Sequence, residues 1–199
     1  MDKEMLEFYK NALRGDINAT PLCAEYKSLW RKCGDDKESL VRFALMQQSI
    51  PYFVTASKNN LGLSKEYIMN TFGDYINGNR ILCDVEGVEG YSYQLYVGFE
   101  GEIAVSTDVT SLMWCNTPTV EIEECKCPIL YVSNSSDIRI MCNGFNSINI
   151  KLFDDSKVTI FDMDETCNAL IYKYSDDAEV EIGKYCLGKV KTFRKELKL

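Results

Sequence analysis

The feature that most constrains the fold of this chain is an alternation of apolar and polar residues that returns about every ten residues in its C-terminal half. Alternation with a period of two is typical of β-strands that bury one face. The clearest segments are 137–140, 147–150, 157–160, 179–182 and 189–192. With Ile129, Ile138, Ile148, Val158, Leu170, Val180 and Val190 as markers, the intervals are 9, 10, 10, 12, 10 and 10 residues. Such regular intervals indicate a structural repeat.

Turn-forming residues separate these segments, and weaker alternating segments precede them. Clusters rich in Ser, Asn and Asp lie at 133–136, 143–144, 154–156 and 175–177, and these residue types favour turns. The weaker segments are 94–97, 102–105, 110–112 and 128–131. We therefore expect an all-β domain of about ten short strands from residue 79 onward.

Two β architectures fit such a repeat. A β-solenoid stacks one short strand for every ten or so residues, and three strands per coil is the arrangement we expect of it. An antiparallel β-sandwich also spaces its strands at about 8–12 residues. Two-residue Asn-Gly hairpin turns are absent from the regular region apart from Asn143-Gly144, and the strands are short. We therefore predict a β-solenoid, with the antiparallel sandwich as the alternative.

Residues 1–78 have the pattern of a small helical segment. Helices are predicted at 3–13, at 20–34, from a capping box that opens at Asp35 with Glu38, at 51–57, and from Ser64 to Gly73. Ile68 and Phe72 share one face of the last helix, and Gly34 and Gly73 are expected to end helices. The predicted fold class is therefore α+β, with a helical segment at 1–78 and a repetitive β domain at 79–199.

The ends of a solenoid carry unpaired backbone groups, which something has to cover. We expect the helical segment 1–78 to cover the N-terminal end of the β domain. The C-terminal stretch 192–199 has Phe193 and Leu197 four residues apart, and it is the candidate cap for the other end.

Charge and targeting signals narrow the range of partners. The chain has 22 basic and 30 acidic residues, a net charge of −8, which repels nucleic acid and anionic lipid. The one basic stretch, from Lys184 to Lys198, is interpreted as a solvated tail. The chain opens with Met1-Asp2-Lys3-Glu4 and contains no apolar run long enough for a membrane span. A cytoplasmic protein is therefore expected.

The nine cysteines are interpreted as small buried residues in a reducing compartment. Cys125 and Cys127 form the only close pair, with Cys115 and Cys142 the nearest others. This spacing lacks the repeated pairs of a zinc site, and the chain has no histidine. Residues two apart in a strand share a face, so Cys125 and Cys127 are expected in one core layer. We predict no metal or cofactor site and exclude Ser-His and Cys-His catalysis.

One segment has the pattern of a catalytic motif. Residues 158–166 read Val-Thr-Ile-Phe-Asp-Met-Asp-Glu-Thr and resemble the D-x-D-x-T signature of haloacid-dehalogenase-type phosphatases. The resemblance implies Asp162 as nucleophile and Asp164 as acid and base, with magnesium bound. In that family the signature ends the first strand of a long α/β domain, whereas 33 residues follow it here. We therefore interpret Asp162 and Asp164 as part of an acidic turn and keep a magnesium-dependent phosphatase as an alternative.

A resemblance over the whole chain rests on three features. These are Leu45 and Tyr52-Phe53 in the helical lead, the stretches 63–68 and 75–79, and the trailing alternating strands. In these features the chain resembles uncharacterised proteins of gut Bacteroidales and their phages and prophages. The resemblance implies a small accessory protein of mobile-element origin and brings no activity with it.

Taken together, these patterns favour a non-enzymatic accessory protein. We expect its repetitive β surface to bind a protein partner or a second copy of the chain. The alternatives are the phosphatase that uses Asp162 and Asp164, and a carbohydrate-binding module, since solenoids often bind glycans.

Overall fold

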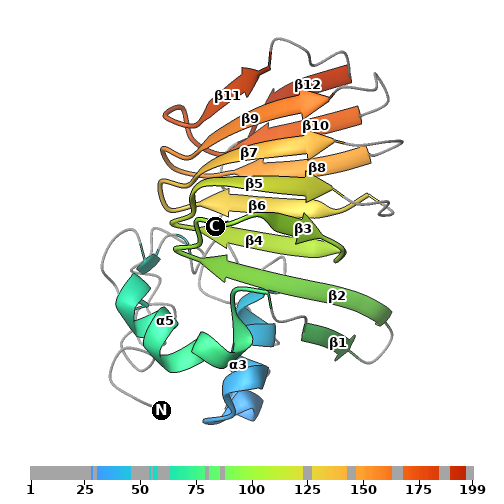
Figure 1. The fold of residues 1–199 in the computed structure, drawn as a ribbon. Coiled ribbons are helices and arrows are strands. Elements are labelled where there is room, and N and C mark those ends of the chain that lie inside the picture. Colours follow the sequence, from blue (N-terminus) through green and yellow to red (C-terminus); the bar gives the residue numbers. More distant parts are fainter. Residues whose placement is uncertain are drawn as a thin grey trace. The chain divides into compact units, whose positions relative to one another are not determined.

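The computed structural model describes residues 28, 31–45, 54, 56–57, 63–78, 81–85, 88–122, 127–142, 147–162, 168–183 and 189–195. The chain divides into two compact units. One is Met1–Ile76 with Leu197–Leu199, and the other is Asn77–Glu196. The first unit contains the helices and the second contains the strands (Figure 1).

Helix α3 (Lys37–Leu45) begins one residue later than the predicted capping box at Asp35. The Asp36 carboxylate accepts a hydrogen bond from the Ser39 backbone N–H at 3.1 Å, and the Asp36 carbonyl accepts the first helical hydrogen bond, from Leu40. Asp36 is therefore the residue in the capping position. Leu40 and Val41 are buried, as predicted.

Helix α5 (Lys65–Phe72) begins as the sequence predicts. The Ser64 hydroxyl accepts a hydrogen bond from the Tyr67 N–H at 3.2 Å, and Ile68 and Phe72 are buried on one face. Gly73 does not turn the chain sharply at the end of the helix. Its φ of −51° keeps the right-handed path, which continues as the short helix η1 (Gly73–Tyr75).

The remaining helix predictions lie partly or wholly outside the described residues. The helix predicted at 3–13 lies outside them. Of the other two, the described residues 28, 31–33, 54, 56 and 57 are helical, and Gly34 follows with a φ of +57°. No helix among the described residues combines the length and the apolar character that crossing a membrane requires.

The second unit is a β-solenoid of about four turns. It starts with β1 (Ile81–Val85), which pairs antiparallel with β2 (Val88–Val97). The strands that follow are β3 (Ile103–Val105), β4 (Val109–Met113), β5 (Asn116–Ile122), β6 (Ile129–Ser133), β7 (Asp137–Cys142), β8 (Ser147–Leu152), β9 (Lys157–Asp162), β10 (Asn168–Lys173), β11 (Glu179–Ile182) and β12 (Lys189–Arg194).

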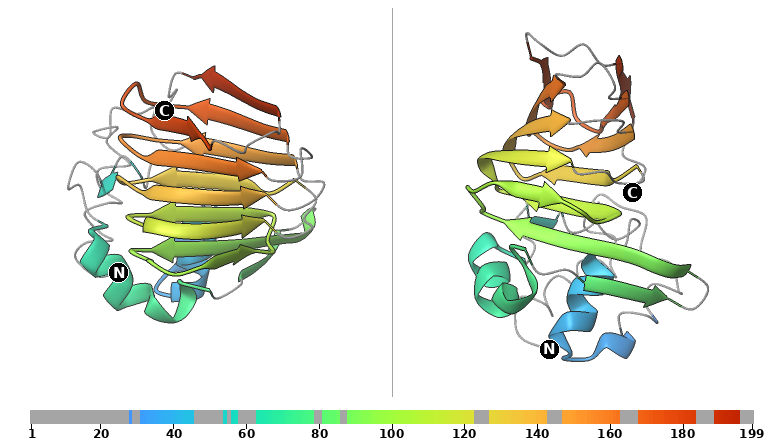
Figure 2. Two further views of the ribbon diagram at one scale, coloured as in Figure 1. Left: turned by 45° about the horizontal axis from the view of Figure 1, so that its top comes forward. Right: turned by 45° about the vertical axis from the view of Figure 1, so that its right-hand side comes forward.

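The chain alternates between two sheets, so each coil contains two strands (Figure 2). The seven-stranded sheet has the order β1-β2-β4-β6-β8-β10-β12, and the five-stranded sheet has the order β11-β9-β7-β5-β3. Val109 pairs with Ile129 and Ile129 with Asn149, so one turn takes 20 residues. The expected three strands per coil are therefore wrong. The ten-residue interval fixes the strand and turn lengths, but it does not fix how far each turn redirects the chain.

Every ladder between β2 and β12 is parallel. Parallel neighbours confirm the solenoid, whereas the alternative sandwich needs antiparallel neighbours. The described chain is mostly parallel β with a few short helices, so the α+β label is not supported. That the helical unit covers the first coil stays a prediction.

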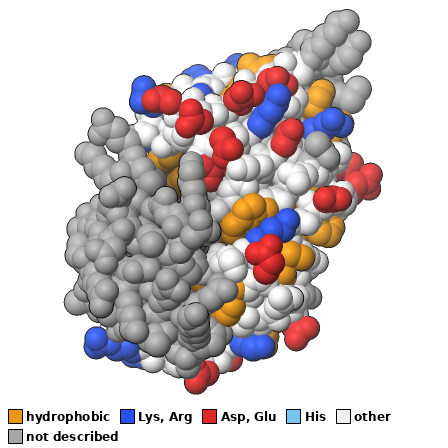
Figure 3. Space-filling view, turned by 90° about the vertical axis from the view of Figure 1, so that its left-hand side faces the viewer, with side chains coloured by type: hydrophobic (Ala, Val, Ile, Leu, Met, Phe, Trp, Pro, Cys, Tyr) orange, Lys and Arg blue, Asp and Glu red, His pale blue; other side chains and the backbone are white. Residues whose placement is uncertain are grey.

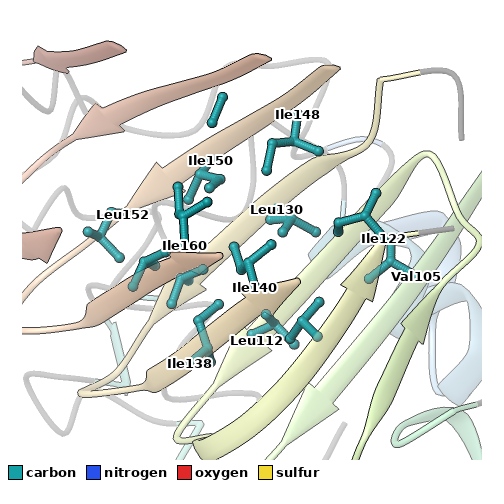
Figure 4. Close-up of a cluster of buried hydrophobic side chains, with 14 of the residues drawn as sticks. Val105, Leu112, Ile122, Leu130, Ile138, Ile140, Ile148, Ile150, Leu152 and Ile160 are labelled. Carbon is teal, nitrogen blue, oxygen red and sulfur yellow. The ribbon is translucent and has the colours of Figure 1, made fainter. Parts of the chain in front are cut away.

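The core of the solenoid lies between the two sheets and consists of aliphatic side chains stacked in register (Figure 4). Val120, Ile140, Ile160 and Ile182 form one such ladder through β5, β7, β9 and β11. The first three are fully buried. Burial of each such side chain contributes about 1.5–3 kcal/mol, and each coil adds one more layer.

Strand β5 is the strand that the alternation did not reveal. Pro118 lies within it, and proline in a run of residues argues against a strand because it lacks a backbone N–H. The structure accommodates Pro118 at an irregularity, because the register with β7 shifts between Asn116 and Thr119. The regular ladder starts again at Thr119.

Replacement of Ile140 by alanine should lower the free energy of unfolding by about 2–5 kcal/mol, because a buried cavity replaces the lost side chain. Ile182→Ala is the matched control. It makes the same chemical change in the same ladder, but Ile182 is 57% exposed, so we expect a loss of about 1 kcal/mol or less in dilute solution. Urea unfolding measures both. Equal losses would contradict the ladder as described.

Candidate interaction surface

The corners that lead from the seven-stranded sheet to the five-stranded sheet stack on one another like strands. The Asp137 N–H donates to the Cys115 carbonyl at 2.9 Å, and the Lys157 N–H donates to the Ser136 carbonyl at 2.7 Å. The next coil repeats the pattern, with a bond of 3.0 Å from Glu179 to Ser156. The backbone hydrogen bonding therefore continues around the corner, which fixes how the second sheet lies against the first.

Residues in the left-handed conformation make these corners tight. Asn134, Ser135 and Asp154 have φ values of +57°, +56° and +47°. Asn and Asp tolerate this conformation better than most residues. The corners coincide with the turn clusters predicted at 133–136 and 154–156, which the structure confirms as turns.

A column of small buried side chains lines the inside of these corners. Ser136 and Ser156 belong to it, and their hydroxyls accept hydrogen bonds from the N–H groups of Cys115 at 3.0 Å and Ser136 at 3.1 Å. Ala178, which is 1% exposed, continues the column in the next coil. Each serine therefore bonds to a backbone N–H of the preceding coil, which links the coils in addition to the strand ladders.

Asp154 is a buried carboxylate at the centre of this corner. Its oxygens accept hydrogen bonds from the N–H groups of Asn134 at 2.7 Å and Ser135 at 3.3 Å, and from the Ser156 hydroxyl at 2.8 Å. A buried charge is tolerated only where such donors offset its lost hydration. Asp154 therefore joins two successive corners.

The side of the solenoid that carries these corners exposes acidic, basic and hydrophobic side chains interspersed with one another (Figure 3). Asp155, Asp176 and Asp177 are exposed there. The Arg194 guanidinium donates to the Asp176 carboxylate at 2.6 Å. This side is mixed in character and does not form a single charged patch.

The five-stranded sheet presents a regular outer face. Its outward side chains are all half-buried or exposed. We call this surface the ladder face, and it consists of Thr119, Glu121, Asp137, Arg139, Met141, Lys157, Thr159, Phe161, Glu179 and Glu181. Neighbouring strands lie about 4.8 Å apart, so these side chains form rows with a fixed spacing along the solenoid.

Charges of opposite sign pair across the strands of the ladder face. The Lys157 ammonium lies 2.8 Å from one Glu181 oxygen and 3.7 Å from a Glu179 oxygen. The hydrogen bond and the charge of Lys157 lower the pKa of Glu181, and the hydrogen bond to Glu181 raises the pKa of Lys157. The groups are exposed, so the pairs contribute little to stability. They do fix the orientation of the side chains.

The outer side of the seven-stranded sheet carries a column of stacked aromatic rings. The rings of Tyr131 and Phe153 are 6.3 Å apart and those of Phe153 and Tyr174 are 4.8 Å apart. The Lys151 ammonium donates to the Tyr131 hydroxyl at 2.8 Å. Burial raises the pKa of Tyr131 and lowers that of Lys151. Sequence reasoning missed this column, whose only signal is an aromatic residue about once per turn.

The cysteine predictions are partly confirmed. Cys115 and Cys142 are buried in the core, but Cys127 is exposed. Its φ of +76° places it in the loop before β6 and not in a strand, so the predicted alternation does not apply to it. Cys125 lies outside the described residues. Within the described ranges, no group of three or more Cys, Asp or Glu residues could hold a metal ion.

The residues of the phosphatase resemblance lie in a coil of the solenoid. Asp162 is the last residue of β9 and pairs with Cys142 of β7. Strand β9 lies between β7 and β11, both of them solenoid strands. The surroundings of Asp162 are therefore not the α/β sheet that the resemblance implies. Asp164 lies outside the described residues.

Comparison of the chain with protein-family models, with curated proteins and with solved structures found no match.

Replacement of Asp154 by alanine should lower the free energy of unfolding by about 2–3 kcal/mol, because it leaves buried N–H groups at Asn134 and Ser135 without their carboxylate partner. Asp155→Ala is the matched control. Asp155 is exposed and accepts one hydrogen bond, from the Ser135 hydroxyl, so we expect a loss of about 0.5 kcal/mol. Denaturant unfolding compares the two, and a similar loss in both would argue against the buried corner.

Replacement of Lys157 by glutamine should raise the pKa of Glu181 toward its ordinary value, because the principal cause of its lowered pKa is then removed. Thr159→Val should raise that pKa less, since the Thr159 hydroxyl makes a longer bond of 3.5 Å. Because the folded-state pKa of Glu181 is lowered, its contribution to stability is present above the unfolded-state pKa and disappears as the pH falls through the folded-state value. Carboxyl titration by NMR measures both shifts, and an unchanged pKa in Lys157→Gln would contradict the pairing.

Proposed function

We propose that this chain is a non-enzymatic binding module that uses its ladder face to hold a protein partner. The observation that carries the proposal is the set of rows that this face presents. Thr119, Arg139, Thr159 and Glu181 form one row, and Asp137, Lys157 and Glu179 form another. Successive coils set these side chains in register, so the face is a preorganised surface of fixed spacing.

Three properties of the ladder face support a protein as its partner. The rows combine both signs of charge with Met141 and Phe161, a mixture typical of protein interfaces. Acidic residues exceed basic ones over the whole chain, which disfavours nucleic acid. The side chains rest on paired strands, so binding need not order them first.

The setting of the protein is part of the same proposal. The resemblance to proteins of gut Bacteroidales and their phages points to an accessory protein of a mobile element that acts in the bacterial cytoplasm. A partner would then be a protein of the host or of the element itself.

The test reverses two charges of the ladder face on neighbouring strands. Glu121→Lys with Arg139→Glu leaves the net charge unchanged, and both residues are exposed. We expect at least a tenfold fall in the enrichment of specific partners captured from bacterial lysate and quantified by mass spectrometry, because like charges would then face the partner.

The control makes a comparable exchange away from the ladder face. Lys65→Glu with Glu66→Lys keeps both charges within α5 and should leave the captured proteins unchanged. If the ladder-face variant and the control captured the same partners in the same amounts, the proposal would fail.

A further inference from the structure

The last coil of the solenoid differs from the others in its exposure. The inward residues of β8 are buried, whereas most residues of β11 and β12 are exposed. Ile182 is 57% exposed and Phe193 is 42% exposed. Both strands end their sheets, and no strand in the described part of the chain pairs with their outer edges.

The predicted cap at 192–199 does not begin where it was expected. Residues 192–194 continue β12 alongside β10 instead of turning over the end of the solenoid. They extend as strand because Val190 packs against the core and Phe193 stacks on Tyr172 with ring centroids 5.4 Å apart. The outer edge of β12 is therefore a regular strand edge.

The two edges at this end carry opposite charges. β11 reads Glu-Val-Glu-Ile, with Glu179 and Glu181 on its outer side. β12 reads Lys-Val-Lys-Thr-Phe-Arg, with Lys189 and Lys191 on its outer side. One end of the molecule thus offers an acidic strand edge and a basic strand edge side by side.

We propose that two copies of the chain join end to end through this last coil, with β12 of each copy pairing antiparallel with β11 of the other. Unpaired edges recruit strands readily. Such a dimer would contain two equivalent strand pairs related by a twofold axis. It goes beyond the ladder-face proposal because backbone edges, and not outer side chains, make the contact.

Charge decides between the two symmetric ways of stacking these ends. A twofold axis parallel to the strands places β12 over the partner's β11, and an axis along the sheet normal places β12 over the partner's β12. Both arrangements make antiparallel pairs. The first sets Lys189 and Lys191 beside glutamates, whereas the second sets lysines beside lysines, and like charges directly opposite are destabilising.

The same arrangement extends the core across the junction. Val180, Ile182 and Val190 lie on the inner side of the last coil, where Val180 and Val190 pack against the core. In the dimer these residues would meet their counterparts in the second copy. Apolar surface at this end would then leave water, which adds a driving force that does not depend on charge.

The test measures the mass of the full-length chain by sedimentation and light scattering over a range of concentrations. We expect a dimer whose Kd rises at least tenfold in Lys189→Glu/Lys191→Glu and in Glu179→Lys/Glu181→Lys, because each sets like charges together at both junctions. The variant with all four substitutions exchanges the two charges and should regain the dimer. An equimolar mixture of the two double variants should also form it.

A proline substitution tests the backbone edge without a change of charge. The Lys195 N–H donates to the Lys173 carbonyl of β10, and alternate residues of a strand point to opposite edges. The N–H of Thr192 therefore points to the outer edge. Thr192→Pro should abolish the dimer and keep the fold, since proline is tolerated on edge strands.

Three results would overturn the proposal. These are a monomeric wild-type chain at every concentration, a four-substitution variant that stays monomeric while folded, and a Thr192→Pro variant that still dimerises. Circular dichroism establishes folding, and Lys157→Ala reports the effect of losing the Glu181 ion pair alone. The ladder-face variant Glu121→Lys/Arg139→Glu should still dimerise, so failure of one proposal is distinguishable from failure of the other.

Discussion

The parallel register between coils is the constraint on which the rest of the structure depends. Because Leu130 pairs with Ile150 and Ile150 with Ile171, each apolar side chain meets one of similar kind in the next coil. A shift of one residue would turn every buried side chain outward, so burial fixes the register. The same register sets the outer residues in rows. The ladder face is therefore a consequence of the core and needs no separate design.

The corners add a second, polar constraint to this apolar one. Ser136, Ser156 and Asp154 bond to the backbone across successive coils, so one corner cannot move without its neighbours. Apolar stacking alone tolerates sliding, whereas hydrogen bonds at 2.7–3.1 Å do not. The side chains that bond at the corners thus hold the two sheets at one relative position, and the outer rows inherit that precision.

The sequence predicts the strands well because period-two alternation, as in Ile138 and Ile140, reports local burial directly. It predicts the number of strands per coil poorly, because that number depends on left-handed residues such as Asn134 and Asp154, whose conformation is not visible in an apolar pattern. Pro118 hid a strand, and Cys127 took a left-handed conformation in a loop. The rows of the ladder face were predictable in kind, but not in membership, since membership requires the register.

A fold made by repetition has no internal reason to stop, because each coil offers the next the same template. Its end must therefore be marked by a change in the repeated residues. Here the outward positions of the last strands become charged, with Glu179 and Glu181 on one edge and Lys189 and Lys191 on the other. Charges on an edge discourage indiscriminate strand addition. When the two edges carry opposite signs, the same charges reject a mismatched strand and accept a matched one, so a single device serves both termination and selective pairing.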